Sequence, residues 1–424
     1  MAGVNKGDGS GVGDSGGESV SGGESDSRGG GGSRGEGDPA VVAPRPAVPR
    51  GPNAALVLDL LRTAGEAGIS RLELAEHAGL TPQAVSKITA RLRADGLVAE
   101  AGHRASTGGK PRTVLRLVPS AAQAVGVHLD RDELTVVLVD LAGTPVAARS
   151  VPLDLGAGTD RVIAAVVEQV AAVRGDARAV GGEARAVRGD ARAVGGEARA
   201  VRGDGLLGVG VAMPGPLDHT TGVPRRVTGF PQWNGVPLRD TLAARLGLPV
   251  VLDKDTNAAA LGLALRGPAD TFAYLHLGTG LGAGLVIDGE LHRGARTGAG
   301  EFGHQVIHLD GPACDCGNRG CIEAICLAAV ARGDLAGAAR VLGAGAANLI
   351  GLLDIDRILL GGRTVTAHEE RFVRGVAAVV AERARCTSVQ VTAAGGGAHP
   401  VAEGAAQLVL APVFGRAEGS RGRR

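Results

Sequence analysis

The sequence predicts an α/β fold that follows a smaller domain of helices and one hairpin. Two different sequence patterns along the chain support this prediction. From residue 122 onward, apolar runs of strand length alternate with helical patterns. This alternation is typical of α/β architecture. Residues 52–118 differ, because three amphipathic helical patterns there precede a single hairpin pattern. A chain of 424 residues is long enough for two or three such domains.

Individual elements follow from these patterns. Strands are expected at 124–129, 134–141, 206–213, 249–253, 271–277, 282–287 and 357–360, and helices at 160–173, 238–246 and 256–265. The stretch 324–357 is also helical in pattern.

Three segments are predicted to lie outside the folded domains. Residues 1–50 are rich in Gly, Ser and acidic residues and then in Pro and Ala, so they cannot bury enough surface to offset their ordering entropy. The block 174–187 recurs unchanged as 188–201, and we interpret 174–204 as a surface insertion with fluctuating helix. The basic end, 416–424, is predicted to be a disordered tail.

Bulk composition restricts the partners and the compartment. A formal net charge of +1 means that any contact with nucleic acid must be local. The chain has no run of 18 apolar residues and no charged start followed by an apolar segment, which predicts neither a membrane span nor a signal peptide. Cys326 and Cys386 stand alone, which fits a reducing cytoplasm.

Residues 51–119 carry the pattern of a helix-turn-helix. Ser70 and Glu73 form a capping box that opens a short helix, which stops near Gly79. Thr81 and Pro82 then open a second helix as N-cap and first helical residue. Two helices joined by a tight glycine turn are typical of this DNA-binding motif.

The second helix and the following hairpin carry the candidate DNA contacts. Val85, Ile88 and Leu92 recur at core-facing spacing. Basic residues gather at the tip of a hairpin formed by 97–101 and 114–118, as in a wing. The candidate DNA-binding residues are Gln83, Ser86, Lys87 and Arg91 on the helix and Arg104, Lys110 and Arg112 in the wing. The alternative is a helical pair that only packs against the large domain.

Four residues between 304 and 321 form a candidate metal site. They are His304, Cys314, Cys316 and Cys321, and three thiolates with one imidazole form a closed, structural donor set for tetrahedral zinc. Glu301 and Glu323 flank the set, and carboxylates beside a rigid metal loop suit hydroxyl-rich ligands. The alternative is a few buried thiols near a surface histidine.

Residues 52–415, apart from the insertion, resemble the ROK family of repressors, open reading frames and sugar kinases, in particular its sugar-responsive regulators of the xylose and N-acetylglucosamine type. The segments that carry the resemblance are 208–218, 231–238, 278–284, 301–304 and 314–323. The resemblance implies a winged helix-turn-helix followed by a two-lobed, actin/hexokinase-like (ribonuclease H-like) domain over 120–415. Sugar would lie between the lobes, beside the zinc loop.

The resemblance also implies roles for individual residues. Asp255 takes the place of the kinases' catalytic base, which accepts a proton from the sugar hydroxyl. The implied sugar-binding set is Asp255, Asn257, Glu301, His304 and Glu323. His304 would also bind the zinc, whose role would be structural.

This chain departs from the kinases in three places. The first phosphate turn, glycine-rich in the kinases, reads His128-Leu-Asp130, which puts a carboxylate where ATP phosphates would lie. The second turn, Gly278, Thr279 and Gly280, would then be vestigial. Lys254 replaces an asparagine beside Asp255. This lysine could suit a phosphorylated or acidic sugar, disable binding, or simply be solvated. The 324–357 region is also shorter than in the family.

Together these patterns predict a cytoplasmic, sugar-responsive regulator and not an enzyme. It would bind operator DNA as a homodimer or higher homo-oligomer, most simply as a repressor of carbohydrate uptake or catabolism genes, and a sugar or sugar derivative would be its effector. Two alternatives stay open. One is an ATP-dependent sugar kinase that carries a DNA-binding domain, and the other is a DNA-binding protein whose sugar cleft is non-functional.

Overall fold

The computed structural model describes residues 51–104, 112–187, 205–267, 270–383 and 389–416. The side chains of Arg104 and of residues 178–187 are outside this description. The predicted tail at 1–50, residues 417–424 of the predicted tail at 416–424, Lys110, Cys386 and the whole second repeat copy also lie outside it.

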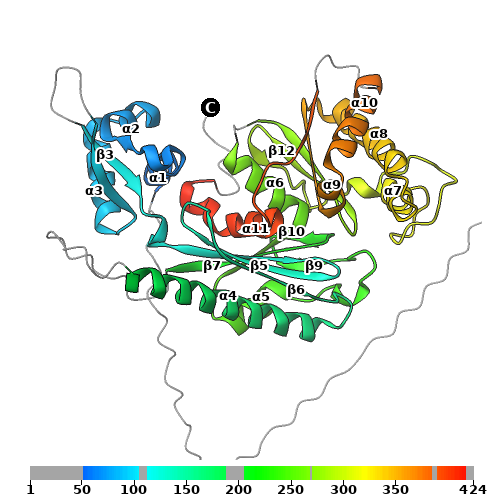
Figure 1. The fold of residues 1–424 in the computed structure, drawn as a ribbon, viewed down its shortest axis with the longest axis horizontal. Helices are drawn as coiled ribbons and strands as arrows, with labels where there is room; N and C mark the ends of the chain where they lie inside the picture. The colour runs from blue at the N-terminus through cyan, green and yellow to red at the C-terminus, as the bar shows by residue number, and fades with distance from the viewer. Residues whose placement is uncertain (1–50, 105–111, 188–204, 268–269, 384–388, 417–424) are drawn as a thin grey trace, which may run out of the picture. The chain divides into compact units, whose positions relative to one another are not determined.

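The N-terminal domain has the predicted three helices and hairpin (Figure 1). Its elements are α1 (Pro52–Ala64), α2 (Arg71–Ala78), α3 (Pro82–Ala94), β1 (Ile69–Ser70), β2 (Val98–Arg104) and β3 (Arg112–Leu117). The capping box at α2 is present, and Gly79 ends that helix in the left-handed conformation. Strands β1 and β2 pair antiparallel with β3, which closes the hairpin onto the helices.

The first lobe of the large domain is a five-stranded sheet in the order β10-β7-β4-β5-β6. Its strands are β4 (Gln123–Leu129), β5 (Glu133–Asp140), β6 (Pro145–Pro152), β7 (Leu206–Met213) and β10 (Val250–Lys254). The β4, β5 and β6 strands run antiparallel in a meander, and β7 and β10 join them in parallel with β4. Helices α4 (Thr159–Val187) and α5 (Leu238–Leu246) cover one face through a shared apolar core.

The second lobe repeats this plan with the order β13-β12-β11-β14-β15. Its strands are β11 (Phe272–Leu277), β12 (Leu281–Ile287), β13 (Glu290–Leu291), β14 (Arg357–Gly361) and β15 (Gln390–Ala393). One face is covered by α7 (Ile322–Ala331), α8 (Leu335–Leu353), α9 (Arg363–Ala367) and α10 (Glu369–Arg383). The predicted helical stretch 324–357 is thus a helical pair packed into this core.

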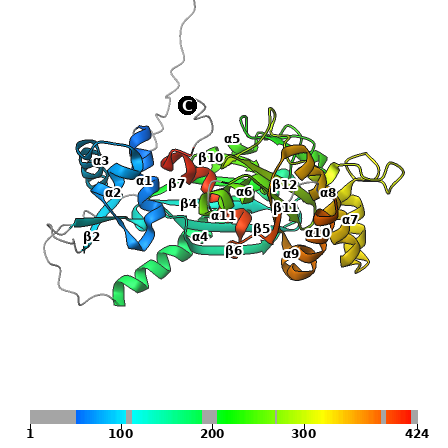
Figure 2. The same ribbon diagram turned by 90° about the horizontal axis from the view of Figure 1, so that it is seen from above.

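Two helices, α6 (Asp255–Arg266) and α11 (Pro400–Leu410), pack against each other between the sheets. Figures 1 and 2 show α11 lying on β4, β5 and β7, on the face opposite α4. Gly404 allows this close packing, because a Cβ there would collide with the carbonyl group of Ala258 on α6. Short elements complete the chain: η1 (Gly65–Ala67), η2 (Pro119–Ala121), β8 (Leu217–Asp218), β9 (Val223–Pro224), η3 (Pro231–Trp233), η4 (Phe302–His304) and η5 (Ala411–Phe414).

One sequence prediction needs correction here. Helix α4 was expected to end near Val173 but continues to Val187, so it includes the first copy of the repeat. Among the described residues, α8 is long and apolar enough to cross a membrane, with a mean hydropathy of 1.4. Arg340 and Asn348 interrupt the apolar run of α8. In the structure α8 packs against α7 and α10 as a core helix.

Candidate functional site

A cavity between the two lobes collects most of the predicted ligand-binding residues. Asp255, Glu301, His304 and Glu323 all line it. The turn that contains Thr279 and Gly280 lines it as well, and so do residues after β4 and β7. Polar groups from both sheets therefore converge on one hollow, as in sites that read small polar molecules.

Asn257, which the resemblance places in the ligand-binding set, does not line this cavity. Its side chain is fully buried, and Nδ2 donates a hydrogen bond of 2.8 Å to Oδ1 of Asp253. Asp253 also pairs with Arg293 at 2.6 Å. Asp253 stands near the end of β10 and Asn257 in the first turn of α6, so this hydrogen bond stabilises the start of the helix.

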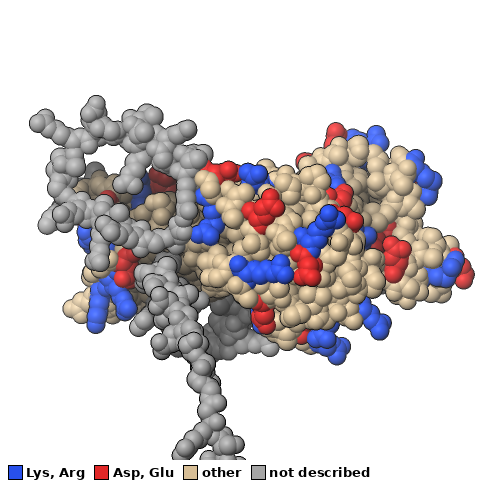
Figure 3. All heavy atoms as spheres, turned by 90° about the horizontal axis from the view of Figure 1, so that it is seen from below, with Lys and Arg blue, Asp and Glu red and all other residues tan. Residues whose placement is uncertain are grey.

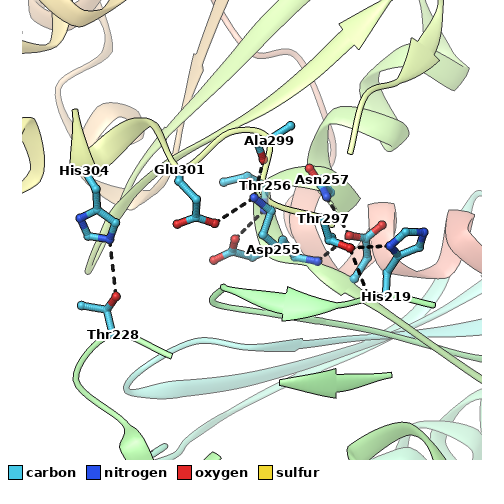
Figure 4. A network of polar contacts seen from close by, with 11 residues as sticks. His219, Thr228, Asp255, Thr256, Asn257, Thr297, Ala299, Glu301 and His304 are labelled. Atoms are coloured by element: carbon cyan, nitrogen blue, oxygen red, sulfur yellow. Dashed lines mark hydrogen bonds and ion pairs between the residues drawn. The ribbon is translucent and has the colours of Figure 1, made fainter. Parts of the chain in front are cut away.

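Lys254 is not a solvated lysine, which removes one of the three interpretations of this residue. Only 2% of it is exposed, and Nζ donates to the carbonyl oxygen of Ala299 at 2.5 Å and to Oε1 of Glu301 at 3.0 Å. A buried ammonium group needs such partners, because removal from water without them costs several kcal/mol. Figure 4 shows Ala299 and Glu301 pointing toward this contact.

Asp255 begins α6 directly after β10 and faces the same cavity. Burial raises the pKa of its carboxyl group to about 7, and the nearby charges of Asp130 and Glu301 add to the effect. The hydrogen bond from the Thr256 backbone N–H, at 2.6 Å, and the charge of Lys254 oppose it. Near neutral pH this group can therefore either donate or accept a hydrogen bond to a ligand hydroxyl.

The four predicted metal donors come together. One donor atom from each of His304, Cys314, Cys316 and Cys321 lies within 4.8 Å of the others. Sγ of Cys316 is 3.7 Å from Sγ of Cys321, and Sγ of Cys314 is 3.7 Å from Nδ1 of His304. Zinc–sulfur bonds of about 2.3 Å in a tetrahedron give sulfur–sulfur edges of about 3.8 Å. The donor set therefore fits tetrahedral zinc in both chemistry and spacing.

The metal loop also holds cavity residues in position. Nδ1 of His304 faces the cluster, while Nε2 lies 3.5 Å from Oγ1 of Thr228 across the cavity (Figure 4). Glu323 follows Cys321 by two residues and accepts a 2.8 Å hydrogen bond from the Leu281 backbone N–H. A bound ion would thus fix the imidazole, and through the loop it would steady both flanking glutamates.

A polar network centred on Asp130, after β4, joins the lobes. Asp130 accepts hydrogen bonds from Oγ1 of Thr279 at 2.7 Å and from Arg363 at 2.9 Å. Burial by itself would raise the pKa of Asp130, but His128, these hydrogen bonds and Arg363 lower it overall. The carboxylate therefore stays ionised, directly against the turn that resembles the second phosphate loop.

On the DNA-binding domain, α3 presents the predicted polar face. Gln83, Ser86, Lys87 and Arg91 are all exposed. Val85 and Leu92 are buried, and Ile88 is half-buried against the same core. In the hairpin, Arg112 is exposed. On the part of the large domain that Figure 3 leaves uncovered, basic and acidic side chains are interspersed.

Helix α1 joins this domain to the large one. Asp59 pairs with Arg62 at 2.6 Å and with Arg416 at 2.9 Å. Arg62 also lies over the ring of Phe414 and donates to the carbonyl oxygen of Leu265, in the last turn of α6. The helix that begins in the cavity therefore ends against the DNA-binding domain.

Sequence reasoning assigned no role to three residues that the structure brings to the site. They come from separate segments of the chain. Thr228 and Arg131 line the cavity, and Arg363 lines the neighbouring hollow and donates to Asp130. The sequence could have indicated Arg131, because the resemblance places it in the turn where the kinases have glycine. Nothing in the local pattern around Thr228 or Arg363 signals their partners, which are 76 and 233 residues away in sequence.

The fold and site thus define a two-lobed ligand-binding domain attached to a helix-turn-helix. Residues 196–333 match the model of the ROK family, and residues 57–99 match the model of winged helix-turn-helix DNA-binding domains. The chain is therefore similar to ROK family proteins over this segment, and the segment that matches winged helix-turn-helix domains precedes it.

The relatives include both repressors and sugar kinases. A xylose repressor of Caldicellulosiruptor bescii is 28% identical over 258 residues, which are 60% of this chain and 59% of that protein. A glucokinase of Thermotoga maritima is 44% identical over 128 residues, which are 29% of this chain and 40% of the kinase. The chain thus matches about three fifths of the repressor's length. A crystal structure of a ROK family transcriptional regulator, a homologue of the E. coli MLC protein, superposes with a TM-score of 0.65 at 22% identity and shares the fold. That match covers 86% of this chain and 96% of the other.

Proposed function

We propose that this protein is a sugar-responsive transcription regulator that represses its target genes until a sugar or sugar derivative fills the cavity between its lobes. One observation carries the proposal. Helix α6 has Asp255 of the cavity at its first residue and, in its last turn, contacts α1 of the DNA-binding domain through Arg62. A displacement of one end of a rigid helix also displaces its other end. The relatives named xylose repressor support the same reading.

The cavity offers the chemistry that a polyhydroxylated ligand needs. Glu301 keeps one carboxylate oxygen beyond its bond with Lys254, and its side chain is 35% exposed. Asp255 can donate or accept, and His304 presents Nε2. Hydrogen bonds to charged groups are the stronger class, so these groups would recognise hydroxyl positions well. The same arrangement argues against the alternative of a non-functional cleft.

Zinc would be held by His304, Cys314, Cys316 and Cys321 in a structural role. When bound, the ion would keep the three sulfurs as thiolates and fix the orientation of the imidazole. The protein's own contribution is the loop that joins this cluster to Glu301 and Glu323.

A kinase function is the weaker alternative. Phosphoryl transfer depends on positioning and on neutralising the charge of the phosphates. Asp130 adds a negative charge beside the remaining turn, and its contacts with Thr279 and Arg363 occupy the space between the lobes. Asp255, which would be the base, would therefore have a ligand hydroxyl to bind but no phosphate donor in place.

The regulator would act in the cytoplasm as a homodimer or higher homo-oligomer, with residues 51–119 on operator DNA and 120–415 as the sensing domain. Ligand binding would shift the relative population of two lobe arrangements, and α6 and α11 would carry the shift to α1. The spacing of two recognition helices would then no longer suit the operator.

A thermal-shift screen of the zinc-loaded protein against monosaccharides, amino sugars and sugar phosphates tests the ligand half of the proposal. We expect at least one compound to stabilise the protein, and Glu301→Gln to abolish that shift. Gln keeps an acceptor for Lys254, so the variant should still fold, and Glu370→Gln on exposed α10 is the matched control. A coupled assay for ATP consumption with the same compounds distinguishes the kinase. No stabilisation by any compound would support the non-functional cleft.

A further inference from the structure

Among the residues that the structure describes, the guanidinium of Arg131 lines the cavity without an ion-pair partner. We propose that the effector is an anionic sugar derivative, with a phosphate or carboxylate group that Arg131 binds. This rests on the proposed function, because it specifies the ligand class of the same cavity.

Backbone hydrogen bonds hold Arg131 in place, and its side chain lines the cavity. Its N–H donates to Oδ1 of Asp130 at 2.7 Å, and its carbonyl oxygen accepts from the N–H of Leu155 at 3.0 Å. The guanidinium lies over the ring of Phe230, 5.9 Å from its centroid. Among the described residues, no carboxylate lies within ion-pair distance of it. A guanidinium stacked on an aromatic ring keeps its N–H groups available for an anion.

The guanidinium also reaches the turn that would face a ligand's anionic group. A Cβ atom placed on Gly280 would lie 3.3 Å from Nη2 of Arg131 and 3.2 Å from Oε2 of Glu323. Gly280 leaves this space open, at the turn resembling the kinases' second phosphate loop. Glu323 borders the same space, and its Oε2 already accepts the Leu281 N–H.

The other acidic groups around the cavity do not exclude an anion. Glu301 is balanced by Lys254, and Asp130 by Arg363 and the hydroxyl of Thr279. Asp255, with a pKa near 7, is substantially protonated at neutral pH. Lys254, the cation that the sequence suggested for an acidic sugar, is already neutralised by Glu301. Arg131 is therefore the residue that remains for this role.

The geometry gives the ligand a direction. Its ring hydroxyls would face Glu301 and His304, and its anionic group would point toward Arg131 and the turn at Gly280. Arginine binds phosphate and carboxylate groups through two parallel N–H bonds, and the resulting contact gives both affinity and orientation. The regulator would then respond to a sugar that has been phosphorylated or oxidised, instead of to the neutral sugar.

Isothermal titration calorimetry of the full-length protein tests this with matched compounds. The probes are glucose, glucose 6-phosphate and glucuronate, then xylose and xylose 5-phosphate, and inorganic phosphate alone. We expect one anionic derivative to bind at least tenfold more tightly than its neutral parent. A phosphate ester and a carboxylate are distinguished by which of the two is preferred.

Two variants connect the preference to the residue. Arg131→Gln should reduce the anionic-to-neutral ratio to within threefold while leaving the neutral sugar's Kd within threefold, and Arg131→Lys should restore part of the ratio. Arg374→Gln, on the exposed face of α10, is the matched control and should change nothing. Unchanged melting of Arg131→Gln without ligand would show that the fold is intact.

Four results would overturn the inference. They are neutral sugars binding as tightly as their anionic derivatives, a preference that survives Arg131→Gln, inorganic phosphate binding as tightly as the sugar phosphate, and no binding by any probe. Failure of the proposed function would be seen separately, as an absence of operator footprinting by the ligand-free wild-type protein.

Discussion

Replacing Asp255 with Asn should stabilise the protein above neutral pH while weakening ligand recognition. The pKa of this carboxyl is raised from 3.8 to about 7, mainly by burial. The folded state therefore binds more protons than the unfolded state between these values. Stability is lost as the pH rises through this range, and the loss is complete above pH 7. Asn has no charge to desolvate, and its Oδ1 can still accept the Thr256 N–H.

The size of the effect follows from the shift. A difference of about three pKa units corresponds to roughly 4 kcal/mol at 1.36 kcal/mol per unit. The cavity is open to water, which screens the charge, so we expect about 1–3 kcal/mol. The free energy of unfolding of Asp255→Asn should exceed that of the wild type by about 1–3 kcal/mol at pH 8, and the difference should shrink as the pH falls and vanish only below about pH 4, under the unfolded-state pKa.

Urea unfolding at a series of pH values measures this difference. Trp233, the single tryptophan, is fully buried and reports unfolding by fluorescence. Asp160→Asn is the control, because that carboxylate is 91% exposed in the first turn of α4 and should show no such pH dependence. A variant-minus-wild-type difference that is flat from pH 5 to 8, or that shrinks as the pH rises, would refute the reasoning.

Three further perturbations test other parts of the account. Cys316→Ser should lower zinc from one per chain, measured by elemental analysis, and unchanged zinc would rule out the donor set. Arg91→Ala should weaken binding to all DNA sequences and reduce the salt slope by about one. Gln83→Ala or Lys87→Ala should instead cost about 1–3 kcal/mol of binding free energy at one base position. Full operator affinity in the variant with alanine at Gln83, Lys87 and Arg91 would show that α3 is not the recognition helix. Asp59→Ala should destabilise by about 2 kcal/mol in calorimetry by leaving two arginines without their carboxylate, and no loss of stability would mean that the joint at α1 contributes little.

Features that depend on local sequence could be predicted well. The caps at Ser70 and Thr81 need only neighbouring residues, and both helices begin where their patterns indicate. Buried strands such as β7 and β11 read as continuous apolar runs. The cysteine and histidine donors lie within one short loop, so their spacing alone brings them together.

Features that depend on partners distant in the sequence could not be predicted. Lys254 meets Glu301 across 47 residues, and Arg363 meets Asp130 across 233, so neither pattern shows the other's charge. Strand β6 has no buried residue, because it lies at the sheet edge, and its pattern carries no apolar signal. The resemblance implies a ligand role for Asn257 by position, but it does not show the hydrogen bond between that amide and Asp253, the aspartate paired with Arg293.

The central claim is that ligand in the cavity releases DNA without being phosphorylated. It is tested most directly by titrating a fluorescent operator fragment with zinc-loaded protein and following anisotropy, with and without the compound that stabilises the protein most. We predict that the operator Kd rises at least tenfold with that compound in the absence of ATP, and that the compound is recovered with its mass unchanged. An operator Kd that no ligand alters, or that changes only when ATP is present, would contradict the account.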